Sequence, residues 1–276
     1  MLRSSARSRF DRLARAGTVV LRDPAEGIER VREKIANESE RWRRRPPLVV
    51  DADWEGSLHA QLETPRPCDA IDAFAPLWSE VVGSLEDRGL YVGRGAYSGW
   101  DDADPALARA AWCLTRHSKP LVVVETGVAR GFTTRVVLEA LEANGAGRLF
   151  SIDLPPPLDQ TRLANETGAA VTESLRSRWT LIEGSSRRRL PELLRDLGTI
   201  DLFIHDSRHT RRNISFELRL AWGALRAGGF VAADDIHGNT GFQDALRAFG
   251  WPRSIVCPSD DGGGKFGLIQ KPHRTP

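Results

Sequence analysis

Short apolar runs alternate with helical patterns from about residue 105 to the C-terminus. The run LVVVE at 121–125 is β-branched and nearly all apolar, which is typical of a parallel strand buried on both faces. FTTRVVLEALEANG, at 132–145, then repeats its apolar positions with helical spacing and ends on a glycine suited to a helix C-terminus. The same alternation predicts seven strands, at 121–125, 148–153, 179–184, 201–206, 230–235, 254–258 and 264–270.

Helices are expected between these strands and just before the first one. Asp104 and Pro105 fit the start of a helix over 106–117, because an Asp side chain can cap it and proline suits its first turn. Further helices are expected at 186–197, at 241–250 and, up to a Gly-Gly pair, at 210–229. Strands that alternate with helices form a parallel sheet covered on both faces, and the last two strands, joined by DDGGG, form a hairpin. The pattern therefore predicts an α/β fold: a Rossmann-like, doubly wound, mostly parallel seven-stranded sheet with an antiparallel C-terminal hairpin.

The N-terminal part of the chain lacks this alternation. AEGIERVREKIANESERWRRR, at 25–45, has the pattern of a charged helix with few apolar positions, and the proline pair after it ends that helix. The next stretch is irregular, with one amphipathic helix near 70–88. We therefore expect a helical and irregular N-terminal extension in front of the sheet. The expected divisions are a basic helical arm, a cap or lid segment and the sheet-containing domain, at 1–47, 48–104 and 105–276.

Composition and charge narrow the class of protein. The chain has 276 residues, of which 41% are hydrophobic, and this suffices for one α/β domain with an appendage. It has no apolar run of the roughly 18 residues that a membrane span needs. Residues 1–45 carry 13 Lys and Arg against seven Asp and Glu. A solvated helix, or one packed on a partner subunit, explains this mixed charge better than a nucleic-acid-binding arm does.

The three cysteines, Cys68, Cys113 and Cys257, are far apart in the sequence and form no CxxC pair. This spacing argues against a disulfide framework and against a structural zinc site. Reduced cysteines fit a cytoplasmic location best. The Arg- and Ser-rich N-terminus has no apolar core after its arginines, so a secretory signal is not expected there.

The turn after the first strand is the main candidate for cofactor binding. Ligands of open α/β sheets bind at the carboxyl ends of the strands, near the switch point of the topology. Glycines in this turn allow the backbone to bend tightly and to approach a ligand closely. The helix that follows offers unpaired N–H groups at its start. The cofactor-binding residues expected here are Glu125, Thr126, Gly127, Gly131 and Thr133.

Residues at the next strand ends extend this candidate site. Asp153 ends the second strand, where a carboxylate can accept hydrogen bonds from both hydroxyls of a ribose. Gly184 and Ser185 stand at the end of the third strand, where the edge of an adenine would lie. The glycine spacing G-x-x-x-G differs from the G-x-G-x-x-G of dinucleotide sites, which must admit a pyrophosphate. Over 105–270 these features resemble the class I S-adenosylmethionine-dependent methyltransferases, although Ala129 stands where many members carry a glycine.

Three carboxylates stand at the ends of the fourth and fifth strands, at Asp206, Asp234 and Asp235. Neighbouring parallel strands would bring them together, and their repulsion then requires either protonation or a bound cation. Helix capping and backbone hydrogen bonds are the alternative explanation for these residues. Ligand sets made only of oxygen favour Mg²⁺ or a similar hard ion over zinc.

The sequence HDSRHT…ADDIHG, with 28 residues from Asp206 to Asp234, resembles the metal-dependent O-methyltransferases. This group includes the catechol and the macrocin-type sugar O-methyltransferases. The resemblance implies that Asp206, Asp234 and Asp235 bind Mg²⁺, and that His209 is the general base with Asp206 beside it at the catalytic centre. An imidazole with a pKa near 6.5 suits a base that works at neutral pH.

We therefore expect an S-adenosylmethionine-dependent enzyme that methylates an oxygen of a small hydroxylated acceptor, such as a sugar or natural product, with Mg²⁺. A metal-independent methyltransferase of the same fold and a non-catalytic, partner-binding Rossmann-like protein are the alternatives. HDSRH replaces the Asn/Asp-Pro-Pro-aromatic motif that often marks methylation of nucleic-acid bases, so a nucleic-acid partner is not expected. The arm is a candidate for homo-oligomer contacts. The candidate lids are 90–102 and 154–168, with Tyr91, Tyr97 and Trp100 as candidate contacts.

Overall fold

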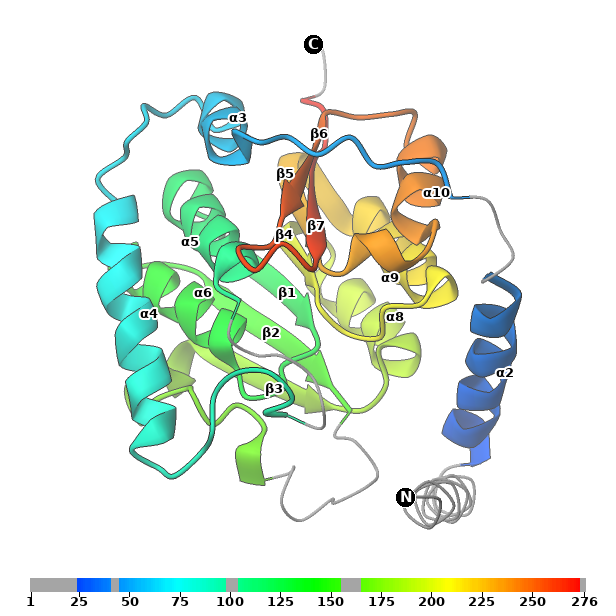
Figure 1. Cartoon of the computed structure of the whole chain (residues 1–276), viewed down its shortest axis with the longest axis horizontal. Helices are drawn as coiled ribbons and strands as arrows, with labels where there is room; N and C mark the ends of the chain where they lie inside the picture. The colour runs from blue at the N-terminus through cyan, green and yellow to red at the C-terminus, as the bar shows by residue number, and fades with distance from the viewer. Residues whose placement is uncertain (1–23, 41–44, 98–103, 155–164, 274–276) are drawn as a thin grey trace.

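A seven-stranded sheet forms the centre of the fold, with the strand order β3-β2-β1-β4-β5-β7-β6 (Figure 1). Strands β1 to β5 are parallel, and β7 runs antiparallel to both β5 and β6. The predicted mostly parallel sheet with an antiparallel C-terminal hairpin is therefore confirmed. The strands are β1 (Val122–Thr126), β2 (Arg148–Asp153), β3 (Trp179–Glu183), β4 (Ile200–His205), β5 (Leu225–Ala233), β6 (Ser254–Pro258) and β7 (Lys265–Gln270).

The computed structural model describes four stretches of the chain, which are 24–40, 45–97, 104–154 and 165–273. Among these residues, none of the helices has the length and hydropathy that a membrane crossing needs. The α-helices are α2 (Pro24–Glu40), α3 (Trp54–Gln61), α4 (Ile71–Glu86), α5 (Ala106–Ser118), α6 (Phe132–Ala143), α8 (Ser186–Leu197), α9 (Arg211–Ala224) and α10 (Gly241–Ala248). Two short 3₁₀ helices are η1 (Glu173–Arg178) and η2 (Ile236–Gly238).

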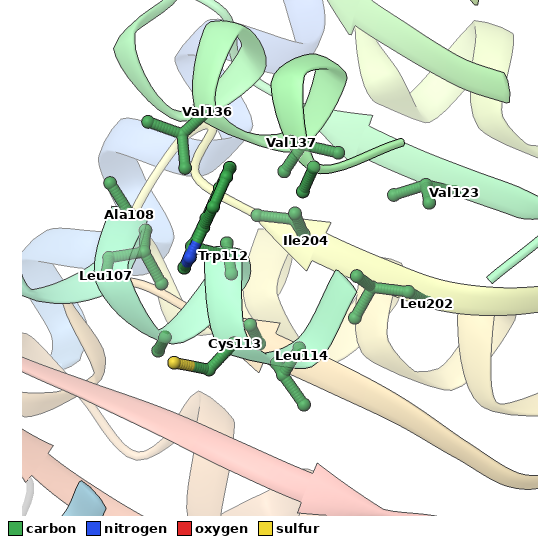
Figure 2. Close-up of a cluster of buried hydrophobic side chains, with 14 of the residues drawn as sticks. Leu107, Ala108, Trp112, Cys113, Leu114, Val123, Val136, Val137, Leu202 and Ile204 are labelled. Atoms are coloured by element: carbon green, nitrogen blue, oxygen red, sulfur yellow. The ribbon is translucent and has the colours of Figure 1, made fainter. Parts of the chain in front are cut away.

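Helices cover both faces of the sheet because the strands are apolar on both sides. Val123 packs with the buried side chains of α5 and α6, whereas the next residue, Val124, packs with those of α8, α9 and α10. Successive strand residues point to opposite faces, so a continuous apolar run builds two cores at once. Figure 2 shows the first core, in which α5 and α6 lie over β1 and β4, with Leu107, Trp112, Leu114, Val136, Val137, Val123, Leu202 and Ile204.

The structure corrects two predicted elements. Residues Trp54–Gln61, expected to be irregular, form α3, whose Trp54 and Leu58 are buried in the first core. The helix expected to run to the Gly-Gly pair ends at Ala224, and Gly228 and Gly229 belong to β5. The Nζ of Lys271 donates to the carbonyls of Trp222 and Leu225 at the end of α9, and so satisfies groups that a helix terminus leaves unpaired. This capping comes from the residue that follows β7, and local periodicity cannot predict it.

The N-terminal helix α2 lies against α9 through charged groups. Glu29 pairs with Arg212 at 2.8 Å, and Glu40 pairs with Arg211 at 3.5 Å. The division of the chain into arm, cap and domain stays a prediction, and so does the homo-oligomer through the arm. Residues 1–23 and 41–44 of the arm lie outside the described residues. The outer face of α2 exposes the apolar residues Ile28, Val31 and Ile35.

Candidate functional site

The turn between β1 and α6 places its backbone directly against the end of β4. Gly127 has a φ of 87°, and a Cβ at this position would lie 2.0 Å from the backbone oxygen of Asp206. Gly131 has a φ of 84°, and its Cβ would lie 3.0 Å from the Cα of Gly168. Both the left-handed conformation and the close approach therefore require glycine. The two predicted loop glycines are the positions on which this turn depends.

Ala129, between them, has a φ of 47°, a left-handed conformation that costs an L-residue roughly 1–2 kcal/mol. This is the position where the resemblance led us to expect glycine. Two hydrogen bonds hold it in place: the N–H of Gly168 donates to the Ala129 carbonyl, and the N–H of Ala170 donates to that of Arg130, both at 2.8 Å. The loop is thus fixed by the segment that follows β2.

Arg130 connects the turn to both candidate lids, 90–102 and 154–168. Its side chain is 1% exposed; it donates to Glu166 at 2.9 Å from Nε and to the carbonyl of Tyr91. The guanidinium also lies over the ring of Tyr97, 5.8 Å from its centre. Tyr97 is buried, with its hydroxyl 3.4 Å from that of Thr167.

The other residues of the candidate lids lie on the surface or outside the described part of the chain. Tyr91 is 67% exposed, and its backbone carbonyl rather than its ring contacts the loop. Trp100 and residues 155–164 lie outside the described part of the chain. The described parts of the two segments therefore meet over the cofactor turn through Arg130, and their role as lids stays a prediction.

Glu125 and Thr126 lie beneath the turn rather than beside it. Glu125 is 1% exposed, and its Oε2 accepts hydrogen bonds from Thr134 at 2.8 Å and Ser151 at 2.7 Å. Burial raises the pKa of Glu125 to about 8. Its Oε1 is buried and has no hydrogen-bond partner among the described residues. The hydroxyl of Thr126 donates to Glu217 at 2.5 Å, so it is occupied, and Thr133 is half-buried at the start of α6.

Asp153 and Ser185 stand at the ends of β2 and β3, next to the turn. Asp153 Oδ1 accepts from the N–H of Leu154 at 2.9 Å, and the N–H of Gly184 donates to the Asp153 carbonyl at 2.8 Å. Burial raises the pKa of Asp153 to about 6, against the lowering effect of backbone N–H groups, including that of Ala129. The Ser185 hydroxyl is buried without a hydrogen-bond partner among the described residues. The roles of these groups as nucleoside contacts stay predictions.

His209 stands at the centre of the acidic cluster formed by Asp206, Asp234 and Asp235. One side-chain ligand atom from each of Asp206, His209 and Asp234 lies within 4.8 Å of the others. The Nδ1 of His209 is 3.0 Å from Asp235 Oδ2, and its Nε2 is 3.6 Å from Asp206 Oδ1. Asp206 and Asp234 thus converge as expected, whereas Asp235, in a left-handed conformation with φ 49°, turns to the other nitrogen of His209.

The carboxylates control the protonation of this imidazole. Burial lowers the pKa of His209, but Asp206, Asp235 and Asp234 raise it more, to about 10. Burial and the charge of Asp206 raise the pKa of Asp234 to about 8, whereas the contact with His209 lowers the pKa of Asp235. Without a bound metal ion, these pKa values make His209 a cation at neutral pH, and its charge offsets part of the negative charge of the cluster.

The sequence reasoning missed Glu217, a fully buried carboxylate on α9 that joins the ends of β1 and β4. Its Oε2 contacts Nδ1 of His205 at 2.6 Å and accepts from Thr126, and its Oε1 accepts from Ser207 at 2.8 Å and Asn213 at 2.7 Å. Burial raises the pKa of Glu217, but His205 and the hydrogen-bond donors lower it to about 2. The available signal was an acid within the apolar face of a predicted helix.

Residues 124–236 match a family model described as a methyltransferase domain. These residues run from β1 to η2 and include the cofactor turn and the acidic cluster. Among curated protein sequences, no significant match is found.

Solved structures agree with the family model at the level of the fold. A candidate O-methyltransferase from Klebsiella pneumoniae has a TM-score of 0.51 and 18% identity, covering 80% of this chain and 98% of its own. An O-methyltransferase from Bacillus cereus in complex with SAH has a TM-score of 0.51 and 14% identity, over 79% and 99% of the two chains. Cofactor-bound Rv0187 from MTB has a TM-score of 0.50 and 17% identity, over 84% and 100%.

Residues 124–236 therefore match a methyltransferase domain, and the sheet that carries them has a Rossmann-like methyltransferase fold. The family predicted from the cofactor turn and the strand-end acids is confirmed. The site residues themselves are not tested by these likenesses, and their roles stay predictions.

Proposed function

We propose that this chain binds S-adenosylmethionine and transfers its methyl group to an oxygen of a small hydroxylated acceptor, with a divalent cation held by the acidic cluster. The observation that carries the proposal is the convergence of Asp206, His209 and Asp234 within 4.8 Å. They converge beside the cofactor turn, since the backbone of Asp206 lies directly against Gly127. An imidazole, two carboxylates and the turn after β1 thus meet at one edge of the sheet.

The groups around the turn fit S-adenosylmethionine. Asp153, at the end of β2, would accept hydrogen bonds from the ribose hydroxyls, and Ser185 has a buried hydroxyl in need of a partner. The buried Oε1 of Glu125 is a second polar atom without a hydrogen-bond partner, below the loop. Unsatisfied buried polar atoms are uncommon, and a ligand that pairs with them recovers their desolvation cost. The cofactor also has no phosphate that would need a wider turn.

The donor set fits a divalent cation at Asp206 and Asp234, because two carboxylates on neighbouring strands are ligands that hard cations prefer. When bound, such a cation lowers the pKa of an acceptor hydroxyl and orients it. His209 can act as the base only in its neutral form, and positive charge beside Asp206 and Asp234 opposes its protonation. The imidazole would then take the proton of the acceptor hydroxyl.

The atoms balance in this reaction. The acceptor oxygen forms a bond to the methyl carbon while the bond from that carbon to the sulfonium sulfur breaks. The hydroxyl proton passes to His209, and S-adenosylhomocysteine leaves with a neutral sulfur. Holding donor and acceptor in line supplies up to about 7–11 kcal/mol of the barrier reduction in favourable cases.

A metal-independent methyltransferase is the second candidate, and one observation favours it. His209 lies between Asp235 and Asp206 and its pKa is raised to about 10, so its positive charge offsets part of the negative charge of the cluster without a metal ion. In that case, His209 would orient the acceptor as a cation, and the hydroxyl proton would pass to a carboxylate of the cluster instead of to the imidazole. Turnover unaffected by EDTA would favour this candidate.

The test has two independent parts. Calorimetry with S-adenosylmethionine should show binding to the wild-type protein and weaker binding to Asp153→Asn. Transfer of a labelled methyl group to a panel of catechols, sugars and other hydroxylated compounds should require added Mg²⁺ or Mn²⁺ and should fail in Asp234→Asn. Glu173→Gln, at a side chain that is 92% exposed, is the control for both parts. No cofactor binding by the folded wild-type protein would refute the proposal.

A further inference from the structure

A second group of potential metal ligands lies away from the methyltransferase site. His59 on α3, Cys68 in the segment before α4, and Cys113 on α5 are all buried, and one ligand atom from each lies within 4.8 Å of the others. Cys68 and Cys113 are far apart in the sequence, but the fold brings their sulfur atoms together. Local spacing could not show it, because the fold brings three separate elements together.

His117 belongs to the same group. It follows Cys113 by four residues on α5, so both side chains lie on one face of that helix. The ring of His117 is 5.6 Å from the ring of His59, edge to face. Its Nε2 is buried and has no hydrogen-bond partner among the described residues. We call His59, Cys68, Cys113 and His117 the Cys-His cluster.

The tautomer of His59 suits metal binding. Its Nδ1 is 2.7 Å from the carbonyl oxygen of Glu55, which can only accept, so Nδ1 carries the proton. The Nε2 therefore offers its lone pair, and it lies 3.1 Å from the sulfur of Cys68. A histidine ligand in a metal site usually donates its other N–H to a backbone carbonyl or carboxylate in this way.

The distances suit one tetrahedral ion. Zinc bonds of about 2.3 Å to sulfur and about 2.0–2.1 Å to nitrogen put neighbouring S and N ligand atoms about 3.6 Å apart. The separations in the cluster, 3.1 Å for one pair and at most 4.8 Å among three ligand atoms, bracket that value. Small side-chain rotations would thus bring these three ligand atoms to one ion, and His117, whose ring lies 5.6 Å from that of His59, would supply the fourth ligand.

The backbone around Cys68 is held in place independently of the thiol. The indole N–H of Trp112 donates to the carbonyl of Ala70 at 2.7 Å, and the N–H of Ile71 donates to that of Cys68 at 3.0 Å. Trp112 neighbours Cys113 on α5, so this contact fixes the loop opposite the second thiol. A cluster held ready by its surroundings costs less free energy to assemble around an ion.

We propose that His59, Cys68, Cys113 and His117 bind one structural zinc ion, which fastens α3 and the segment before α4 to α5. Two thiolates and two imidazoles form the closed ligand set of structural zinc sites and leave no position for a substrate. The two thiolates balance the charge of the ion, which permits its burial. Hard ions such as Mg²⁺ are not suited to sulfur ligands. This site goes beyond the proposed methyl transfer and does not depend on it.

The site also explains how the N-terminal extension is held to the sheet-containing domain. Helix α5 ends at Ser118, just before β1 begins, so His117 lies toward the amino end of β1, and the cofactor turn follows the other end of that strand. The ion would therefore stabilise the packing of α3 without contacting cofactor or acceptor.

The test measures metal in the full-length protein purified without chelators from zinc-supplemented cells. We expect about one zinc per chain in the wild-type protein, and less than a tenth of that in Cys68→Ser and Cys113→Ser. Cys257→Ser is the matched control, because Cys257 is an equally buried free cysteine in β6, outside the cluster. Asp234→Asn should also keep its zinc, which separates this site from the acidic cluster.

Wild-type protein alone provides a second readout that needs no folded variant. Replacing zinc with Co²⁺ should produce thiolate-to-cobalt charge-transfer absorption and the visible bands of tetrahedral cobalt. Wild-type protein with neither zinc nor these bands, equal metal loss in Cys257→Ser, or a Cys68–Cys113 disulfide found by mass spectrometry would each overturn the proposal.

Discussion

Replacing Glu217 by glutamine removes a charge from the centre of the buried network without changing its shape. In the wild-type protein, this carboxylate accepts from Thr126, Ser207 and Asn213 and contacts Nδ1 of His205. Glutamine keeps one acceptor oxygen but presents an NH₂ group where the other oxygen was. Because the residue is fully buried, water cannot replace the lost acceptor. We therefore expect Glu217→Gln to fold less stably.

The expected loss of stability in Glu217→Gln follows from the pKa of Glu217. Its fall from the ordinary value of 4.5 to about 2 corresponds to about 3 kcal/mol of stability at neutral pH. A protein of this size loses about 2–4 °C of melting temperature per kcal/mol, so the variant should melt about 6–12 °C lower. That loss is a substantial part of the 5–15 kcal/mol that stabilises most proteins.

The pH dependence of this stability difference shows whether the charge of Glu217 causes it. A carboxylate whose folded pKa is lowered stabilises the protein fully above its unfolded pKa, and this contribution disappears as pH falls through the folded pKa. For Glu217, the window therefore runs from pH 4.5 down to about 2. The difference in unfolding free energy between wild type and Glu217→Gln should be constant near neutral pH and less than half as large by about pH 3.

Urea unfolding of both proteins, followed by circular dichroism at several pH values, measures this difference. Glu173→Gln is the control, since that side chain is 92% exposed and should shift stability by less than about 0.5 kcal/mol. The reasoning would be refuted if Glu217→Gln lost less than about 1 kcal/mol of unfolding free energy at neutral pH. It would also be refuted if the difference between the two proteins did not shrink on acidification.

Three further predictions concern the methyltransferase site. Gly127→Ala should lose S-adenosylmethionine binding by calorimetry, because its Cβ would lie 2.0 Å from the oxygen of Asp206; Gly262→Ala, at a φ of 73° with open space around it, should retain binding. Wild-type cofactor affinity should fall as pH drops through about 6, where Asp153 takes up a proton, and a flat profile from pH 5 to 8 would contradict this. Asp206→Asn should lower the pKa of His209 in an NMR titration, because one of the charges that raise it is removed.

The sheet could be predicted because its strands are nearly all-apolar runs, and a short run of this kind indicates a buried strand without knowledge of its neighbours. The positions of the acids at the strand ends could also be predicted, because the carboxyl ends of parallel strands lie at one edge of the sheet. Asp153, Asp206 and Asp234 all follow this rule, and the structure places them at one edge of the sheet. The glycine requirement at Gly127 followed from the tight turn that a strand-to-helix connection needs.

Contacts between distant segments could not be predicted in the same way. Lys271 ends α9 from the far end of the chain, and the carboxylate of Glu217 meets its partners only when α9 packs beside β4. Cys68 and Cys113 are separated by the whole of α4, yet their ligand atoms lie together. Periodicity reports which face of an element is apolar, but it does not report which partner that face meets.

The raised pKa values at the carboxyl edge of the sheet bear on which cofactor the site can hold. Burial and mutual repulsion raise the pKa of Glu125 and Asp234 to about 8 and that of Asp153 to about 6. A pyrophosphate would add negative charge beside these groups and raise the cost of their ionisation further. A sulfonium and a divalent cation add positive charge and favour the ionised carboxylates instead. The edge is thus arranged against a dinucleotide and in favour of S-adenosylmethionine, and binding of NAD in the same calorimetric assay would contradict this.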